Sequence, residues 1–121
     1  MKRQCLPKSS RLAGNKAFKA VLARKLRFSN DLLTLYLAEN KLNRPRLGLS
    51  VGKAVGNSVQ RNRLKRLLRE IFRRNQDKVP AGYDYVIMLS KKQQDSEAGR
   101  LSFEQLREAF MGLIADAKKR I

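Results

Sequence analysis

Residues 56–74 read GNSVQRNRLKRLLREIFRR, and this stretch decides how the chain around it is interpreted. At about 100° per residue, a helix over 58–74 gathers its large apolar side chains in one arc and most of its cations in the opposite arc. The apolar arc comprises Leu64, Leu67, Leu68, Ile71 and Phe72, and the basic arc comprises Arg63, Lys65, Arg66, Arg69, Arg73 and Arg74, with Asn62 inside it. Arg61 falls at the edge of the apolar arc, so its guanidinium must reach around the first turn. The stretch predicts an amphipathic helix with one face for a core.

The opposite face is unusual because its charge has one sign. Solvated helix faces usually mix acids and bases, since like charges at i, i+4 repel by a few tenths of a kcal/mol. Lys65, Arg69 and Arg73 follow one another at that spacing, and only Glu70 offsets them. A bound polyanion would reverse this cost. Asn57 or Ser58 would cap the helix and leave free N–H groups at an end where phosphates bind well.

The composition agrees with a folded, polyanion-binding protein. The chain has 121 residues, 28 Lys and Arg against 10 Asp and Glu, a formal charge of +18 and 42% hydrophobic residues. This length is typical of a single domain, here 1–121. Cys5 is the one cysteine, so no intrachain disulfide can form, and no run is long enough to span a membrane or to act as a signal peptide. We expect a cytoplasmic protein.

The rest of the chain predicts one sheet with helices packed on it. Helical spacing covers 15–25 with Asn15 as N-cap, and 102–120 with Ser102 as N-cap. Alternation predicts strands around 33–37 and 46–51, expected to form a hairpin, with a short strand near Arg27 before them. Residues 83–89 are apolar on both faces, as a central strand requires. The fold class is an α+β sandwich, with a basic arm over about 1–10 and a polar, mobile loop over about 91–100.

The order of residues in the basic helix resembles the signature of the bacterial ribonuclease P protein subunit. That signature is R-N-R followed by K-R, an apolar pair and another Arg. Its members here are Arg61, Asn62, Arg63, Lys65, Arg66 and Arg69. The resemblance extends over most of the chain, through RLGLSV before the helix and YDYVIML after it. One departure is Ala54, where the family more often has a second lysine after Lys53.

The resemblance implies an αβββαβα sandwich with a left-handed crossover through the basic helix, against the usual right-handed rule. It implies that the protein binds a catalytic RNA, and that the holoenzyme, a ribonucleoprotein endonuclease, removes the 5′ leader from precursor tRNA to give mature 5′ ends. The RNA would use Mg²⁺ that it holds itself. The resemblance assigns RNA binding to Arg61, Asn62, Arg63, Lys65, Arg66, Arg69 and Arg73, and a leader-binding groove to Phe18, Tyr36, Ser50 and Lys53. Phe18 fits a core position equally well, whereas Tyr36 lies opposite Leu33, Leu35 and Leu37.

The residues themselves suggest no catalytic centre in the protein. The chain has no His, its acids show no metal-ligand clustering, and no Ser or Cys has an evident partner base. We therefore expect no catalytic residue, no bound metal or cofactor, and no activity of the protein alone. Three alternatives stay open: a ribosomal-protein-like RNA binder, a basic amphipathic helix for a membrane or for calmodulin, and a protein-only nuclease. The oligomeric state is not predicted.

Overall fold

A computed structural model describes Arg11 and residues 15–24, 26–30, 32–40, 42, 44–52, 56–89 and 102–120. In chain order the elements are α1 (Asn15–Ala23), β1 (Leu26–Ser29), β2 (Leu33–Glu39), β3 (Arg46–Ser50), α2 (Ser58–Arg74), the 3-10 turn η3 (Gln76–Lys78), β4 (Tyr83–Leu89) and α3 (Phe103–Arg120). The predicted α+β class and the αβββαβα order are confirmed, with η3 added. The arm 1–10, the loop 91–100 and Lys53 lie outside the described residues.

The four strands form one mixed sheet in the order β1-β2-β4-β3. β2 pairs antiparallel with β1 and β4, and β3 pairs parallel with β4. The predicted hairpin between the strands 33–37 and 46–51 is therefore wrong, because β4 lies between them and the hairpin is β1–β2. Alternation fixes which face a strand buries but not which strand is its neighbour. The doubly apolar β4 takes a central place, where both of its faces are covered.

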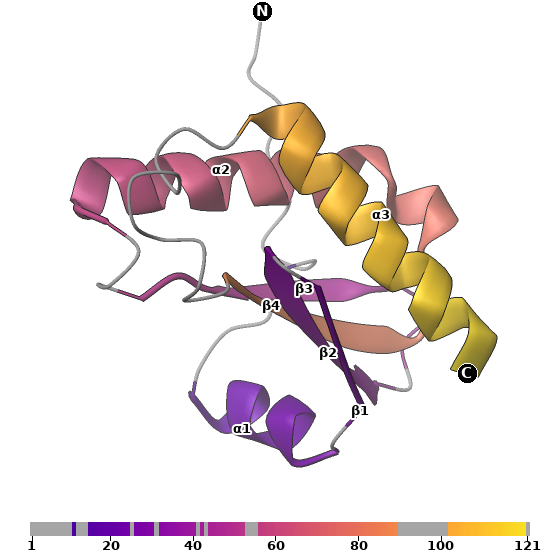
Figure 1. Ribbon diagram of the computed structural model, residues 1–121. Helices are drawn as coiled ribbons and strands as arrows, with labels where there is room; N and C mark the ends of the chain where they lie inside the picture. The colour runs from indigo at the N-terminus through magenta and orange to yellow at the C-terminus, as the bar shows by residue number, and fades with distance from the viewer. Residues whose placement is uncertain are drawn as a thin grey trace, which may run out of the picture.

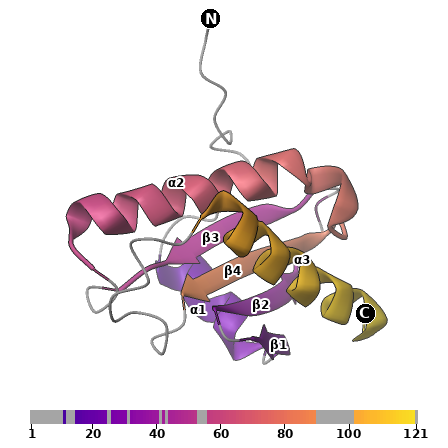
Figure 2. The same cartoon turned by 45° about the horizontal axis from the view of Figure 1, so that its top comes forward.

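The connection from β3 to its parallel neighbour β4 runs through α2. In Figure 2 both strands point to the left, β3 lies above β4, and α2 crosses on the viewer's side of the sheet. This path is a left-handed crossover, the rare sense that the family resemblance implied. It places α2 directly over the edge strand β3.

Helices cover both faces of the sheet, with α2 and α3 on one side and α1 on the other (Figure 1). The main core lies under α2 and α3, where Leu33, Leu35 and Leu37 are fully buried. Phe72 packs edge-on against Tyr85 and Phe110, with ring centroids 5.9 Å and 6.3 Å away. The smaller core lies under α1 and consists of Val21, Ala38 and Val86. Because side chains alternate between the two faces of the sheet, the strands contribute to two cores of unequal size.

Local signals set the ends of the helices. Asn57 caps α2 through a reciprocal pair, in which its Oδ1 accepts from Gln60 N and its own N donates to Gln60 Oε1, both at 2.9 Å. The helix ends at Arg74, where the Asn75 N–H bonds back to carbonyls of the last turn. Ser102 caps α3 as predicted, with its Oγ accepting from Gln105 N. Asn15, by contrast, is the first residue of α1 rather than a residue before it.

Candidate nucleic-acid interface

The apolar face of α2 is used by the core. Leu64, Leu68, Ile71 and Phe72 are buried, and Leu67 is half-buried against them. A membrane or a calmodulin-like partner would need this face to be free. The structure therefore leaves the basic face as the surface that α2 presents outward.

The predicted cations of α2 lie along that outer face. Asn62 and Arg66 are exposed, while Arg63, Lys65 and Arg69 are half-buried. Partial burial, with a smaller contribution from the neighbouring Arg11 guanidinium, lowers the pKa of Arg69 below its ordinary value. The structure thus brings together on one face the predicted RNA-binding residues Asn62, Arg63, Lys65, Arg66 and Arg69.

Arg11 joins this surface from a distant part of the chain. It forms a parallel bridge with Leu47, at the outer edge of β3, and α2 packs over that strand. Sequence reasoning gave Arg11 no role. Nothing in the local sequence pattern indicates that it lies beside Arg69, since the two are brought together by the fold.

The C-terminal end of the basic face carries its own counter-charge. Glu70 accepts two hydrogen bonds from Arg73, at 2.9 Å and 2.6 Å, and one from Arg74 at 2.7 Å. The bonds from Arg73 in particular lower the pKa of Glu70 to about 2. Arg74 also stacks over the Phe103 ring, 5.3 Å from its centroid. Arg73, predicted to bind RNA, therefore has an intramolecular partner in Glu70, which it shares with Arg74.

Arg61 reaches back over the first turn of α2, as its position on the wheel predicted. Its Nε donates to the Gly56 carbonyl at 3.2 Å, and its Nη2 lies 3.4 Å from Ser58 Oγ. The side chain is half-buried. Arg61 thus lies at the start of the basic face and points away from the middle of it.

A second surface lies on the opposite face of the sheet, beside α1. The strand register places Thr34, Met88 and Ser50 in one row across β2, β4 and β3, and Tyr36 opposite Val86 in the next row. All but the buried Val86 are half-exposed. Because α1 packs on β2 and β4, it covers Val86 but leaves the row through Ser50 more open. We call the surface made by Phe18, Thr34, Tyr36, Ser50 and Met88 the α1-side groove, because the resemblance assigns the leader-binding groove to Phe18, Tyr36 and Ser50.

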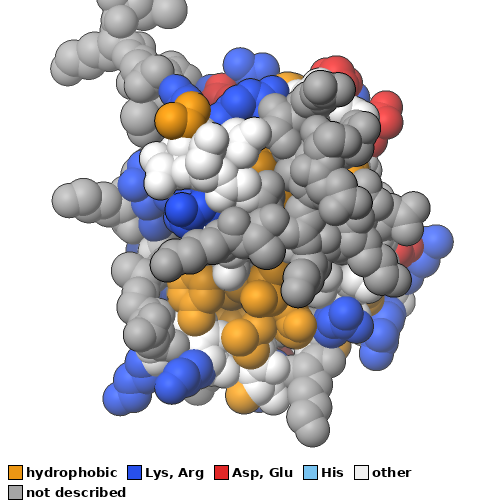
Figure 3. Space-filling view, turned by 60° about the vertical axis from the view of Figure 1, so that its left-hand side comes forward, with side chains coloured by type: hydrophobic (Ala, Val, Ile, Leu, Met, Phe, Trp, Pro, Cys, Tyr) orange, Lys and Arg blue, Asp and Glu red, His pale blue; other side chains and the backbone are white. Residues whose placement is uncertain are grey.

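Both predicted aromatics line this groove. Phe18 and Tyr36 are half-buried and pack at the margin of the small core, so Phe18 is partly a core residue and partly a surface one. Figure 3 shows hydrophobic side chains gathered in one surface patch with Lys and Arg on both sides of it. Ser50 belongs to the same surface, and Lys53 lies outside the described residues.

Sequence reasoning missed three residues of this region. Met88 was placed in a central strand, although its half-exposed side chain lies between Thr34 and Ser50. Arg27 is exposed on β1 at the position paired with Tyr36, so it adds a cation to this surface. The alternation that singled out Tyr36 also singles out Thr34, whereas Met88 and Arg27 needed the strand pairing.

An ion pair closes the far end of the same sheet face. Arg46 donates to both carboxylate oxygens of the buried Asp84, at 2.8 Å and 2.7 Å, and Asn40 donates to the same carboxylate at 2.8 Å. The hydrogen bonds to Asp84 raise the pKa of Arg46. The pair joins the edge strand β3 to β4, and its charge is internally balanced.

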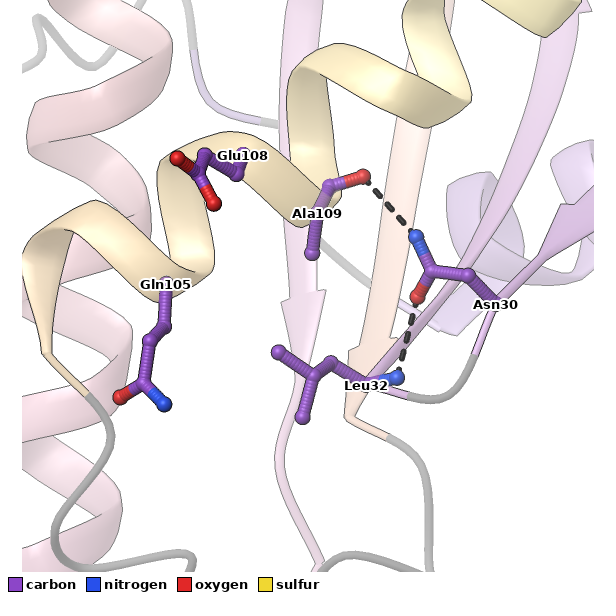
Figure 4. Close-up of a pocket in the computed structure, with 5 residues that line it drawn as sticks. All are labelled: Asn30, Leu32, Gln105, Glu108 and Ala109. Carbon is purple, nitrogen blue, oxygen red and sulfur yellow. Dashed lines mark hydrogen bonds between the residues drawn. The ribbon is translucent and has the colours of Figure 1, made fainter.

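A hollow of about 370 Å³ lies elsewhere, between the β1–β2 turn and α3, and is lined by Asn30, Leu32, Gln105, Glu108 and Ala109. Figure 4 shows Asn30 joining the two elements, with its Nδ2 donating to the Ala109 carbonyl at 3.0 Å and its Oδ1 accepting from Leu32 N. Its one charged side chain is acidic. A carboxylate repels phosphate, so the hollow is less suited to bind RNA than the basic face of α2 or the α1-side groove.

Within the part of the chain that the structure describes, no group of three or more His, Cys, Asp or Glu side chains is placed to hold a metal ion. Among the same residues, no helix is both long enough and apolar enough to cross a membrane.

The fold and the one-sided charge of α2 place the chain in the class of small, basic α+β proteins. The family model described as "Ribonuclease P" matches residues 6–118, nearly the whole chain. The chain therefore belongs to the ribonuclease P protein family. Members are the protein component of a ribonucleoprotein endonuclease of tRNA processing, whose partner subunit is the ribonuclease P RNA.

Individual relatives agree over nearly their full length. The ribonuclease P protein component of Clostridium botulinum strain Loch Maree is 39% identical over 91% of this chain and 96% of its own. The solved structure of the RNase P protein from Thermotoga maritima matches with a TM-score of 0.80 and 33% identity, over 92% of this chain and 96% of that one. The Staphylococcus aureus RNase P protein matches with a TM-score of 0.79 and 27% identity, over 92% and 97%.

Proposed function

We propose that this protein assists the removal of the 5′ leader from precursor tRNA by using two RNA-binding surfaces. The outer face of α2 binds the catalytic RNA, and the α1-side groove holds the single-stranded leader. The observation that carries the proposal is the placement of these surfaces. A cation-rich helix lies on one side of the sheet, and a groove with two half-exposed aromatic side chains lies on the other.

The two surfaces suit two kinds of RNA. A folded RNA is bound chiefly through its phosphates, which a row of Arg and Lys on a helix can contact. Arg suits phosphate particularly, because its planar fork can donate two parallel hydrogen bonds. A single strand is held by bases stacked on aromatic rings and by cations along its backbone. Tyr36 and Phe18 offer the rings, and Arg27 offers a cation beside Tyr36.

The chemistry of cleavage belongs, in this proposal, to the RNA. The chain has no His, and the described residues hold no cluster of metal ligands. The catalytic RNA holds the Mg²⁺ that cleavage uses, and the protein contributes binding and charge. We place this work in the bacterial cytoplasm, where precursor tRNA is made.

The test is the salt dependence of binding to a ribonuclease P RNA. Each phosphate contact that is lost should lower the slope of log K against log salt by about one. Arg66→Ala combined with Arg69→Ala should therefore lower the slope by about two, with the sheet and both cores intact. Arg107→Ala, on α3 and paired with Glu104, is the matched control, and its slope should equal that of the parent. An unchanged slope in the double variant would assign the charge of α2 to solvation.

A further inference from the structure

Arg61 differs from the other cations of α2 in where its side chain goes. Its Nε donates to the Gly56 carbonyl at 3.2 Å, and Gly56 lies outside the helix. Arg66 is the contrasting case, since it is exposed and has no intramolecular hydrogen bond or ion pair within the described residues. A guanidinium that is occupied by its own backbone has fewer donors left for a phosphate.

The backbone of Arg61 contributes to the same turn. Its N–H donates to the Asn57 carbonyl at 2.9 Å, which is the first hydrogen bond of α2. The side chain then holds the preceding residue, Gly56, whose carbonyl precedes the helical ladder. Position 56 has little space, because a Cβ there would lie 2.3 Å from Gln60 Oε1, the atom that completes the capping box. The side chain of Arg61 thus makes the outermost hydrogen bond of a closely packed helix start.

This helix start lies where the chain passes from one proposed surface to the other. Ser50, at the end of β3, belongs to the α1-side groove, and Gly56 follows it six residues later. The basic face begins at Asn62, six residues beyond Gly56. The hydrogen bond from Arg61 to Gly56 therefore fixes Gly56, the residue just before the cap of α2, against the first turn of the helix that carries the basic face.

We propose that Arg61 is a positioning residue, which holds the groove strand in place relative to the basic helix and does not itself bind a phosphate. Removal of the Arg61 side chain should loosen the start of α2 and weaken the preference of the holoenzyme for precursor over mature tRNA. The salt dependence of binding to the catalytic RNA should stay as it is. The RNA readouts rest on the proposed function, whereas the state of the turn can be measured in the free protein.

The experiment compares Arg61→Ala and Arg61→Lys with Arg66→Ala as the matched control on the same helix. Amide hydrogen exchange over 56–60 is measured in the free protein, and the salt slope is measured with a ribonuclease P RNA. The reconstituted holoenzyme then gives the ratio of Kd values for mature and precursor tRNA. Arg61→Ala should speed exchange about tenfold, as expected for a helix start that loses a capping contact. It should lower the Kd ratio about threefold, since small displacements of a binding group weaken its contacts.

Arg61→Lys separates the charge of the arginine from the hydrogen-bonding geometry of its guanidinium. Lys keeps the charge but lacks the planar fork, so Arg61→Lys should leave exchange fast and the Kd ratio low. Both Arg61 variants should keep the parent salt slope, whereas Arg66→Ala should lower it by about one and leave exchange unchanged.

Three outcomes would overturn the proposal: a salt slope that falls by about one in Arg61→Ala, parent exchange rates over 56–60, or full recovery of the Kd ratio by Lys. If Arg61→Ala does not fold, Arg61→Lys carries the same test. An unchanged slope in Arg66→Ala would count against the proposed function instead, and the exchange rates would still decide the role of Arg61.

Discussion

Tyr36 is the residue on which the proposed leader groove depends most. It lies on the sheet face opposite the three buried leucines and is half-exposed beside Phe18 and Arg27. A ring in this position can stack on a base at one face while its other face packs on the small core. Its role in binding is therefore separable from the stability of the main core.

We predict that Tyr36→Ala weakens holoenzyme binding of leader-bearing precursor tRNA about fivefold or more, because stacking on an aromatic is worth about 1 to 3 kcal/mol. Binding of mature tRNA should not change. Tyr36→Phe should keep the parent affinity, since stacking uses the ring and not the hydroxyl. The free energy of unfolding should fall by less than the roughly 3 to 5 kcal/mol typical of a buried aromatic. A collapse of stability with the precursor preference retained would place Tyr36 in the core and the groove elsewhere.

Glu70 is the residue whose protonation at low pH should destabilise the end of α2. Two hydrogen bonds from Arg73, with the one from Arg74 acting in the same direction, lower its folded pKa to about 2, below the ordinary 4.5. A carboxylate with a lowered folded pKa stabilises the protein above its unfolded pKa and loses that contribution as the pH falls toward the folded one. The window of loss is therefore from about 4.5 to about 2.

We expect Glu70→Gln to be less stable than the parent protein by about 1 kcal/mol at pH 7, a value kept small by solvent screening of a partly exposed pair. The difference should shrink below pH 4.5 and be mostly lost near pH 2. Chemical unfolding of both proteins across this range measures it, and the subtraction removes the other carboxylates. A difference that stays constant with pH would mean that the ion pairs contribute nothing to folding.

At the scale of elements, the start of α2 combines a structural cap with the beginning of the surface that we propose binds the catalytic RNA. Asn57 satisfies the Gln60 N–H, and the helix end carries a partial positive charge from its remaining N–H groups. The same few residues therefore affect folding and RNA affinity, and suitable substitutions can separate the two.

Asn57→Ala should lower the free energy of unfolding by about 1 kcal/mol, because it removes the capping oxygen. Asn57→Asp should keep that stability, since a carboxylate caps as well and is favourable at a helix N-terminus. It should nevertheless weaken binding to the catalytic RNA, because it places a negative charge beside the phosphates. Urea unfolding and RNA titration of both variants check this. Equal RNA affinity for parent and Asp variants would show that the RNA does not approach this end.

The elements could be predicted from the sequence where a single periodicity governs them. The wheel of α2 gave its buried and exposed faces, and the alternation of β2 gave the face of Tyr36. The pairing of the strands could not be predicted, because β2 and β3 have similar alternation and neither pattern indicates which strand lies next to it. The groove residue Met88 and the approach of Arg11 to Arg69 both depend on that pairing. They became evident only with β4 between β2 and β3.

At the scale of the whole molecule, the sheet separates the two surfaces. The basic face of α2 lies on one side and the α1-side groove on the other, so neither blocks the other. The left-handed crossover is what links them, since it leads the chain from the groove strand β3 directly into α2. One small domain could then hold a folded RNA and a single strand at once, and its charge of +18 would act on both.

That charge leads to a prediction about magnesium. Two RNAs that approach each other repel, and bound cations, whether Mg²⁺ or the side chains of this protein, reduce the repulsion. Adding the protein to a ribonuclease P RNA should therefore lower the Mg²⁺ concentration needed for half-maximal cleavage of precursor tRNA. The double variant Arg66→Ala with Arg69→Ala should lower it less. Near 1 M salt, where the Debye length is about 3 Å, the effect should largely disappear. The protein without RNA should cleave nothing at any Mg²⁺ concentration, and metal-dependent cleavage by the purified chain would place the catalytic centre in the protein after all.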